Sequence, residues 1–104
     1  MQASRQMDEA VASIDGWRRP LIDSLDWTDM FGQERVLPKF STDMAAALEL
    51  TLLMRRSGRL VITGWGDSWH VYLKTDGLHR QEFSTTSRTL PEAICEVFLL
   101  WRNK

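Results

Sequence analysis

Residues 89–101 read Thr89-Leu90-Pro91-Glu92-Ala93-Ile94-Cys95-Glu96-Val97-Phe98-Leu99-Leu100-Trp101, and this stretch decides the fold of the chain. Thr89 followed three residues later by Glu92 matches a capping box, and Pro91 suits the first turn of a helix. Only Glu92 and Glu96 interrupt the apolar run, and they lie four residues apart on one side of that helix. The sequence therefore predicts a last helix that other elements cover on more than one side.

The polar stripe of this helix continues into an apolar residue, because Leu99 lies three residues beyond Glu96. We predict that Glu92, Glu96, Leu99 and Asn103 form the outer edge of the helix. An apolar side chain on an outer edge often contacts another molecule. Leu99 is therefore the residue of this helix that we expect to touch something outside the chain, and self-association through the helices is an open alternative.

Composition places the chain among ordinary globular proteins. Its 104 residues are 43% hydrophobic and include five tryptophans, which predicts one domain, residues 1–104, able to bury a core. The 13 basic and 14 acidic residues leave a net charge of -1, so no overall charge attracts the chain to nucleic acid or to an anionic membrane. The apolar runs are too short to cross a bilayer, and the single Cys95 fits a reducing cytosol, so we expect a soluble cytoplasmic protein.

The first part of the chain, residues 1–39, predicts a leading helix followed by an ordered loop. Met7, Val11 and Ile14 recur at the spacing of an amphipathic helix over residues 4–15, and Gly16 is placed to end it. Regular periodicity fades from Leu21 to Pro38. We interpret that segment as an acidic, aromatic loop that includes a short β-ribbon.

The second part, residues 40–104, predicts an α-β-β-β-α core. Ser41 or Thr42 is placed to cap a helix that runs to Arg56, with Asp43 in its first turn. The pattern then alternates, and Gly66-Asp67 suits a two-residue hairpin turn. That turn sets a register in which Trp65 lies opposite Ser68, and Leu60, Ile62, Gly64, Trp69, Val71 and Leu73 share one face.

The second hairpin is predicted to turn at Thr75-Asp76-Gly77. A two-residue loop would place Arg80 and Glu82 on the apolar face, which would bury charges without partners. A three-residue loop with a glycine bulge instead places His79, Gln81 and Phe83 there, with Phe83 opposite Trp69. The third strand is polar enough to be an edge, and Ser84 to Arg88 would lead to the last helix. The predicted class is α+β, with a three-stranded antiparallel sheet in an α/β/α sandwich-like arrangement.

Four stretches resemble the Phage ABA sandwich domain family of small bacteriophage and prophage proteins. They are Met7 to Trp17 with Arg18, Trp27-Thr28-Asp29 with Gly32, Leu37-Pro38-Lys39-Phe40-Ser41-Thr42-Asp43 with Ala45-Ala46-Ala47, and Thr89-Leu90-Pro91-Glu92-Ala93-Ile94-Cys95. Residues 19 to 26 depart most from the family pattern. The resemblance implies a sheet covered by helices and a phage origin. Together with the single cysteine, which fits a reducing cytosol, this leads us to expect a location in the host cytoplasm. The resemblance implies no activity.

The acidic, aromatic loop is the predicted partner-binding segment. Aromatic residues and methionine anchor protein interfaces, and carboxylates around them suit a basic partner surface or imitate phosphates. The alternative is that these aromatics close one end of the core while the charges face solvent. The candidate residues are Asp23, Asp26, Trp27, Asp29, Met30, Phe31 and Glu34.

A second candidate surface lies on the sheet. Trp65 could stack on bases or sugars, or the leading helix could cover it. With Tyr72, Lys74, Arg80 and the arginines near Arg55, it defines the alternative function of a nucleic-acid-binding regulator. The element order is that of a double-stranded-RNA-binding domain, but Thr89-Leu90-Pro91-Glu92 stands where such a domain needs lysines, which speaks against nucleic acid.

No catalytic or metal-binding motif is evident. His70 and His79 sit on different strands and, by strand parity, on opposite faces, and Cys95 lies among apolar neighbours. We therefore expect neither an enzyme nor a cofactor. The favoured function is that of a phage or prophage accessory protein that binds a host or phage protein stoichiometrically, such as an inhibitor of a host defence system of the anti-CRISPR kind.

Overall fold

The computed structural model describes residues 4–20, 27–77 and 80–103 of the chain. The described elements share a mixed α+β order, in which a small ribbon separates the first helix from the main sheet. In chain order they are α1 (Arg5–Ile14), β1 (Trp27–Thr28), β2 (Glu34–Arg35), α2 (Met44–Ser57), β3 (Gly58–Trp65), β4 (Ser68–Thr75), β5 (Glu82–Ser87) and α3 (Leu90–Arg102). The predicted α+β class and α-β-β-β-α core are confirmed, as are the leading helix and the ribbon.

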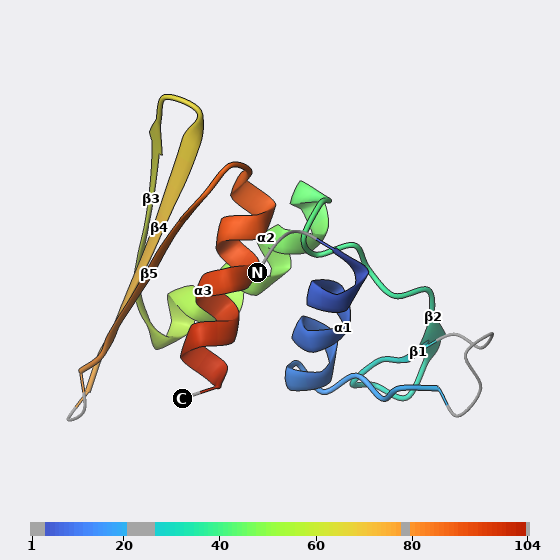
Figure 1. Ribbon diagram of the computed structural model, residues 1–104. Coiled ribbons are helices and arrows are strands. Elements are labelled where there is room, and N and C mark those ends of the chain that lie inside the picture. Colours follow the sequence, from blue (N-terminus) through green and yellow to red (C-terminus); the bar gives the residue numbers. More distant parts are fainter. Residues whose placement is uncertain (1–3, 21–26, 78–79, 104) are drawn as a thin grey trace.

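The helices and the ribbon form successive layers on one side of the main sheet. β3, β4 and β5 form an antiparallel sheet in that order, and α2 and α3 lie on one of its faces, as Figure 1 shows. α1 packs against α3 on the far side, and the β1–β2 ribbon lies beyond α1 (Figure 1). The leading helix therefore does not cover Trp65, because it adds a third layer behind α3 instead of lying across the sheet.

α3 forms the centre of the core, as its sequence predicts. Its residues Ala93, Ile94, Val97 and Phe98 are buried, and Val71 and Leu73 of β4 meet it from the sheet. Cys95 is buried as well, and desolvation raises the pKa of its thiol to about 12. That thiol is therefore protonated at neutral pH and serves packing.

The start of α3 differs from the predicted capping box in one respect. Thr89 occupies the N-cap position and Pro91 lies in the first turn, but the Thr89 side chain accepts no capping hydrogen bond. The helix begins because proline fixes the backbone and because its apolar side chains are buried. The start of the helix was predicted correctly, but the predicted capping hydrogen bond of the Thr89 side chain is not formed.

The first hairpin has the predicted register. Trp65 lies opposite Ser68 and Ile62 opposite Val71, across the turn at Gly66. The second hairpin differs: Leu73, not Trp69, lies opposite Phe83, and Trp69 lies opposite Ser87. The shift is an even number of residues, so Phe83 keeps the predicted face. The connection between β4 and β5 is longer than predicted, so β5 includes Ser84 to Ser87, which were predicted to follow the strand. His79 lies outside the described residues.

The cap of α2 also differs from the prediction, because Asp43 fills the N-cap and accepts a hydrogen bond from the Ala45 N–H at 3.0 Å. Ser41 is buried instead. Its N–H donates to Asp8 of α1 at 2.7 Å, and its hydroxyl donates to the carbonyl of Ser4 at 3.2 Å. Ser41, which the sequence predicted as a candidate cap of α2, therefore forms a tertiary contact with the first helix instead.

Across the part of the chain that the structure describes, no helix combines the length and apolarity needed to cross a bilayer.

Candidate protein-binding site

The tip of the β1–β2 ribbon is a tight turn built around one carboxylate. Oδ1 of Asp29 accepts hydrogen bonds from the N–H groups of Phe31 and Gln33, both at 2.9 Å. The Asp29 backbone adds two more bonds, to the Gln33 carbonyl and from the Gly32 N–H. Gly32 has a φ of 83°, a conformation that glycine adopts without steric cost. The sequence Asp-Met-Phe-Gly thus folds into a fixed loop through its own polar groups.

Asp29 is also tied to the strand that returns from the tip. Its Oδ2 lies 3.5 Å from a guanidinium nitrogen of Arg35. The hydrogen bond from the Gln33 N–H, with those from Phe31 and Arg35, holds the pKa of Asp29 below its ordinary value. The carboxylate is therefore charged at neutral pH, where it stabilises the turn.

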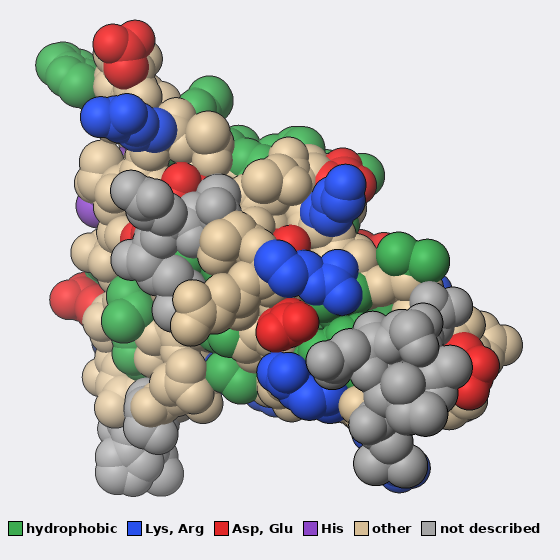
Figure 2. Space-filling view, turned by 45° about the vertical axis from the view of Figure 1, so that its right-hand side comes forward, with side chains coloured by type: hydrophobic (Ala, Val, Ile, Leu, Met, Phe, Trp, Pro, Cys, Tyr) green, Lys and Arg blue, Asp and Glu red, His purple; other side chains and the backbone are tan. Residues whose placement is uncertain are grey.

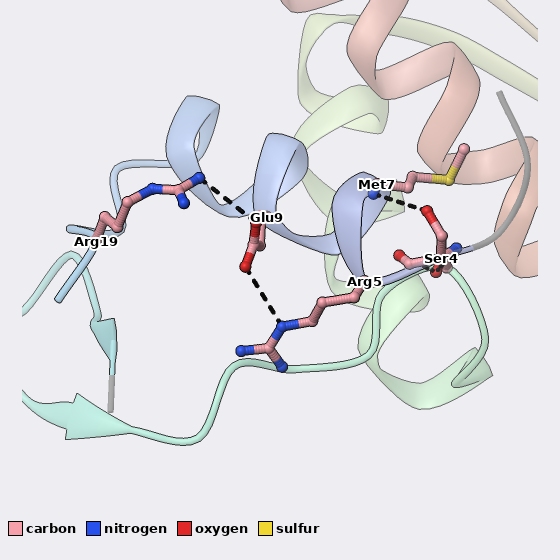
Figure 3. Close-up of polar contacts among 6 residues, drawn as sticks. Ser4, Arg5, Met7, Glu9 and Arg19 are labelled. Carbon is pink, nitrogen blue, oxygen red and sulfur yellow. Dashed lines mark hydrogen bonds and ion pairs between the residues drawn. The ribbon is translucent and has the colours of Figure 1, made fainter. Parts of the chain in front are cut away.

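The base of the ribbon is packed into the body of the molecule. Trp27 is only 3% exposed, and the Arg19 guanidinium lies 5.1 Å from the centre of its ring. Arg19 also pairs with Glu9 of α1 at 3.5 Å, and Arg5 pairs with the same carboxylate (Figure 3). In the same view the Ser4 hydroxyl accepts the Met7 N–H and caps α1. Trp27 therefore closes one end of the core, which decides between its two interpretations.

The side chains at the tip point outward. Phe31 is 83% exposed, Met30 is also exposed, and Val36 is exposed on the strand side of the ribbon. Glu34 lies on β2 and is exposed. Sequence reasoning missed Val36, and its apolar neighbour Leu37, which is buried, gives no local signal that Val36 is exposed.

The predicted loop therefore splits into two groups with different roles. Trp27 and Asp29 are buried and hold the ribbon, whereas Met30, Phe31 and Glu34 form its surface. Asp23 and Asp26 lie outside the described residues. We use the name ribbon tip for Met30, Phe31 and Gly32 with their neighbours Glu34 and Val36.

A shallow hollow of about 100 Å³ lies beside the ribbon tip. Its lining combines aromatic and charged side chains: Asp15, Trp17, Asp29, Met30, Phe31, Arg35 and Glu49. Arg35 stacks over the ring of Trp17 at 5.3 Å. Burial raises the pKa of Asp15 above its ordinary value, although the charge of Arg102 opposes that shift. The surroundings of the ribbon tip are thus both apolar and acidic.

One of the secondary surface candidates, Leu99, is located differently than expected. Leu99 is only 8% exposed, so the prediction that it lies on the outer edge is wrong. The side of α3 that carries Glu96 and Leu99 faces β5. The hydrogen bond from the Thr85 hydroxyl of β5 to Glu96 shows this orientation. Leu99 instead lines a surface hollow of about 430 Å³ with Thr85, Glu96, Leu100 and Asn103. Leu100, next along the helix, is 49% exposed.

Trp65 and Tyr72 lie on the face of the sheet that no helix covers in the described part of the chain. Trp65 is 83% exposed. The Tyr72 hydroxyl donates to Glu82 at 2.5 Å, and that bond raises the Tyr72 pKa. Lys74 lies between Arg59 and Glu82 in the register, so this face carries two cations next to one carboxylate.

The outer half of the β3–β4 hairpin carries further exposed apolar residues. Ile62 and Trp69, which the register placed on the core face, are about two-fifths exposed because the hairpin projects past the helices (Figure 1). Figure 2 shows hydrophobic side chains at this projecting end, next to charged ones. Strand parity predicted their face correctly but could not show where the helical cover stops.

Within residues 4–20, 27–77 and 80–103, no three His, Cys, Asp or Glu side chains gather in a way that would hold a metal ion. His70 is engaged locally, since its Nδ1 lies 3.1 Å from the Thr86 hydroxyl on β5.

Comparison of the chain with protein-family models, with curated proteins and with solved structures gives no match.

Proposed function

We propose that this protein acts by binding a protein partner stoichiometrically through the ribbon tip. The observation that carries the proposal is an exposed phenylalanine, Phe31, on a turn that its own hydrogen bonds to Asp29 hold in place. A large apolar side chain on a fixed turn loses little conformational freedom on binding, so more of its burial appears as affinity. Aromatic residues and methionine are also enriched among the anchors of interfaces.

The chemistry around the tip defines the partner. Met30 and Phe31 need an apolar pocket, and the carboxylates of Glu34, Asp15 and Glu49 favour a rim of lysine or arginine around it. We place this partner among the proteins of a bacterial host. The resemblance to phage and prophage proteins supports that placement. The small size of the chain and its exposed ribbon tip favour stoichiometric inhibition of a host defence system as the role.

The test is affinity capture from a host lysate with the wild-type chain and two matched variants. Phe31→Ala removes the ribbon-tip aromatic, and Trp65→Ala removes an aromatic of equal exposure at the end of the other hairpin. We expect a single partner to be retained by the wild type and by Trp65→Ala, and lost at least tenfold with Phe31→Ala. Equal capture by all three chains would contradict a role for the ribbon tip.

The salt dependence of binding distinguishes the alternative, nucleic-acid binding, from protein binding. Binding to DNA or RNA through Lys74 and Arg80 would weaken steeply as salt is raised, because released counterions drive it. A retardation assay at low and at physiological salt measures this directly. Tight, salt-sensitive retardation would displace the protein-binding proposal.

A further inference from the structure

Among the described residues, β3 is an edge strand of the main sheet. The sheet order is β3-β4-β5, so β4 is the strand that pairs with β3 among the described residues. The two-residue turn makes Trp65 and Ser68 a hydrogen-bonded pair. Because such pairs alternate along an antiparallel ladder, the backbone groups of Leu60, Ile62 and Gly64 point away from β4. These donors and acceptors are arranged to receive another strand.

The two edge strands of the sheet, β3 and β5, differ in how well they are protected from pairing with another strand. β5 is six residues long, carries Glu82 and consists mainly of serine and threonine. β3 is eight residues long, contains no proline and has Arg59 as its only charged residue. Natural edge strands avoid pairing by being short, charged or interrupted by proline. β3 has none of these features along its exposed half, from Val61 to Trp65.

The sequence of β3 is complementary to itself in one antiparallel register. Pairing requires that outward-pointing residues face each other, and a two-fold axis at Ile62 meets that requirement. Ile62 then faces Ile62 of the second copy, and Leu60 faces Gly64. About six new backbone hydrogen bonds result from this register.

The side chains support the same register on both faces of the sheet. On the uncovered face, Arg59 lies opposite Trp65 of the second copy, which allows a cation–π contact twice, once on each side of the axis. On the helical face, the Trp69 ring lies 3.1 Å from the position that a Cβ of Gly64 would occupy. The indole thus fills the place of the missing Gly64 side chain, where Leu60 of the second copy would contact it.

We propose that two copies of this chain associate through β3, with a two-fold axis at Ile62, into a continuous six-stranded antiparallel sheet. This pairing satisfies the outward backbone groups of β3. It also buries the exposed side chains of Ile62 and Trp69, which the helices of one copy leave uncovered. The surface is separate from the ribbon tip, so one dimer presents two ribbon tips.

Sedimentation equilibrium of the full chain, from about 1 µM to about 500 µM, measures the association. The mass of one chain is 12.1 kDa. We expect the wild type to rise to twice this mass and Ile62→Pro to stay at it, because proline removes an outward N–H at the centre of the interface without breaking the ladder to β4. Ser84→Pro is the matched control, since Ser84 has the equivalent outward position on β5. It should associate like the wild type.

A second variant keeps the backbone intact. Trp65→Ala should weaken self-association on the order of tenfold, because it removes both contacts with Arg59, while the thermal unfolding curve stays close to that of the wild type. A wild-type chain that remains at 12.1 kDa at every concentration would overturn the proposal. The same holds for Ser84→Pro dissociating as readily as Ile62→Pro, and for Trp65→Ala associating like the wild type.

Discussion

The β1–β2 ribbon and the β3–β4 hairpin each end in an aromatic residue that is 83% exposed, Phe31 on the ribbon and Trp65 on the β3–β4 hairpin. The ribbon has only two paired residues on each strand, so it depends on side chains: Asp29 fixes its turn and Trp27 anchors its base. The β3–β4 hairpin has eight paired residues on each strand and depends on its ladder. The ribbon is therefore suited to present one side chain, and the longer hairpin is suited to present an edge.

The largest expected effect is at the base of the ribbon. Trp27→Ala removes a fully packed indole and the contact with Arg19, and we expect it to lower the free energy of unfolding by about 3–5 kcal/mol. Chemical denaturation followed by circular dichroism measures this value. A loss below about 1 kcal/mol would show that the ribbon base does not belong to the core.

The base of the longer hairpin gives the next effect. A Cβ added to Gly58 would collide with the backbone carbonyl of Lys74, which cannot move away without disturbing the ladder. We expect Gly58→Ala to cost about 1–3 kcal/mol in the same denaturation experiment. Gly64→Ala is the control, because its Cβ would meet only the movable ring of Trp69, and it should cost clearly less.

Acid should destabilise the turn of the ribbon but not the backbone pairing of β3 with β4. The pKa of Asp29 is lowered in the fold from its ordinary value of 3.8, so its stabilisation is fully present above pH 3.8 and is lost as the pH falls through the lower, folded value. NMR titration should show the Phe31 and Gln33 amide signals shifting together below pH 3.8, while the β3–β4 amides remote from Asp67 and Glu82 stay unchanged. Asp29→Asn should abolish this titration. A midpoint above 3.8 would contradict the lowered pKa.

The smallest effects on stability are expected at the two tips themselves. Phe31→Ala and Trp65→Ala each remove an exposed ring, so each should change the free energy of unfolding by no more than about 0.5 kcal/mol. Their effects on binding should be opposite. Phe31→Ala should lose the protein partner and retain self-association, and Trp65→Ala should do the reverse. One variant that impairs both would show that the two surfaces are coupled.

Local sequence predicted most of the elements correctly. Glycine at position 16 ends α1, the Gly66-Asp67 turn fixes the register of β3 on β4, and the apolar run of α3 marks the centre of the core. These features depend on neighbours along the chain, so their physical causes are visible in the sequence. The partner-binding role of the loop stays a prediction. The sequence could not distinguish the buried Trp27 from the exposed Phe31, since both are aromatic residues in one loop.

What failed depended on contacts between distant segments. Ser41 has the chemistry of a helix cap, but Asp8 and Ser4 of the first helix take its hydrogen bonds. The register of β5 follows from a connection whose length no local rule fixed, and Leu99 is buried because β5 lies along the stripe that includes Glu96.

The sequence by itself determined the periodic elements, the first hairpin and the centre of the core, because backbone preference and hydrophobic spacing act over a few residues. Only the tertiary structure decided that α1 lies behind α3. In the described part of the chain, this leaves one face of the sheet and the outer half of β3 uncovered. Which surface a helix covers depends on how layers pack, and the same apolar stripe on α1 could have met either the sheet or α3. In the described part of the chain, the outer half of β3 and the ribbon tip are therefore exposed.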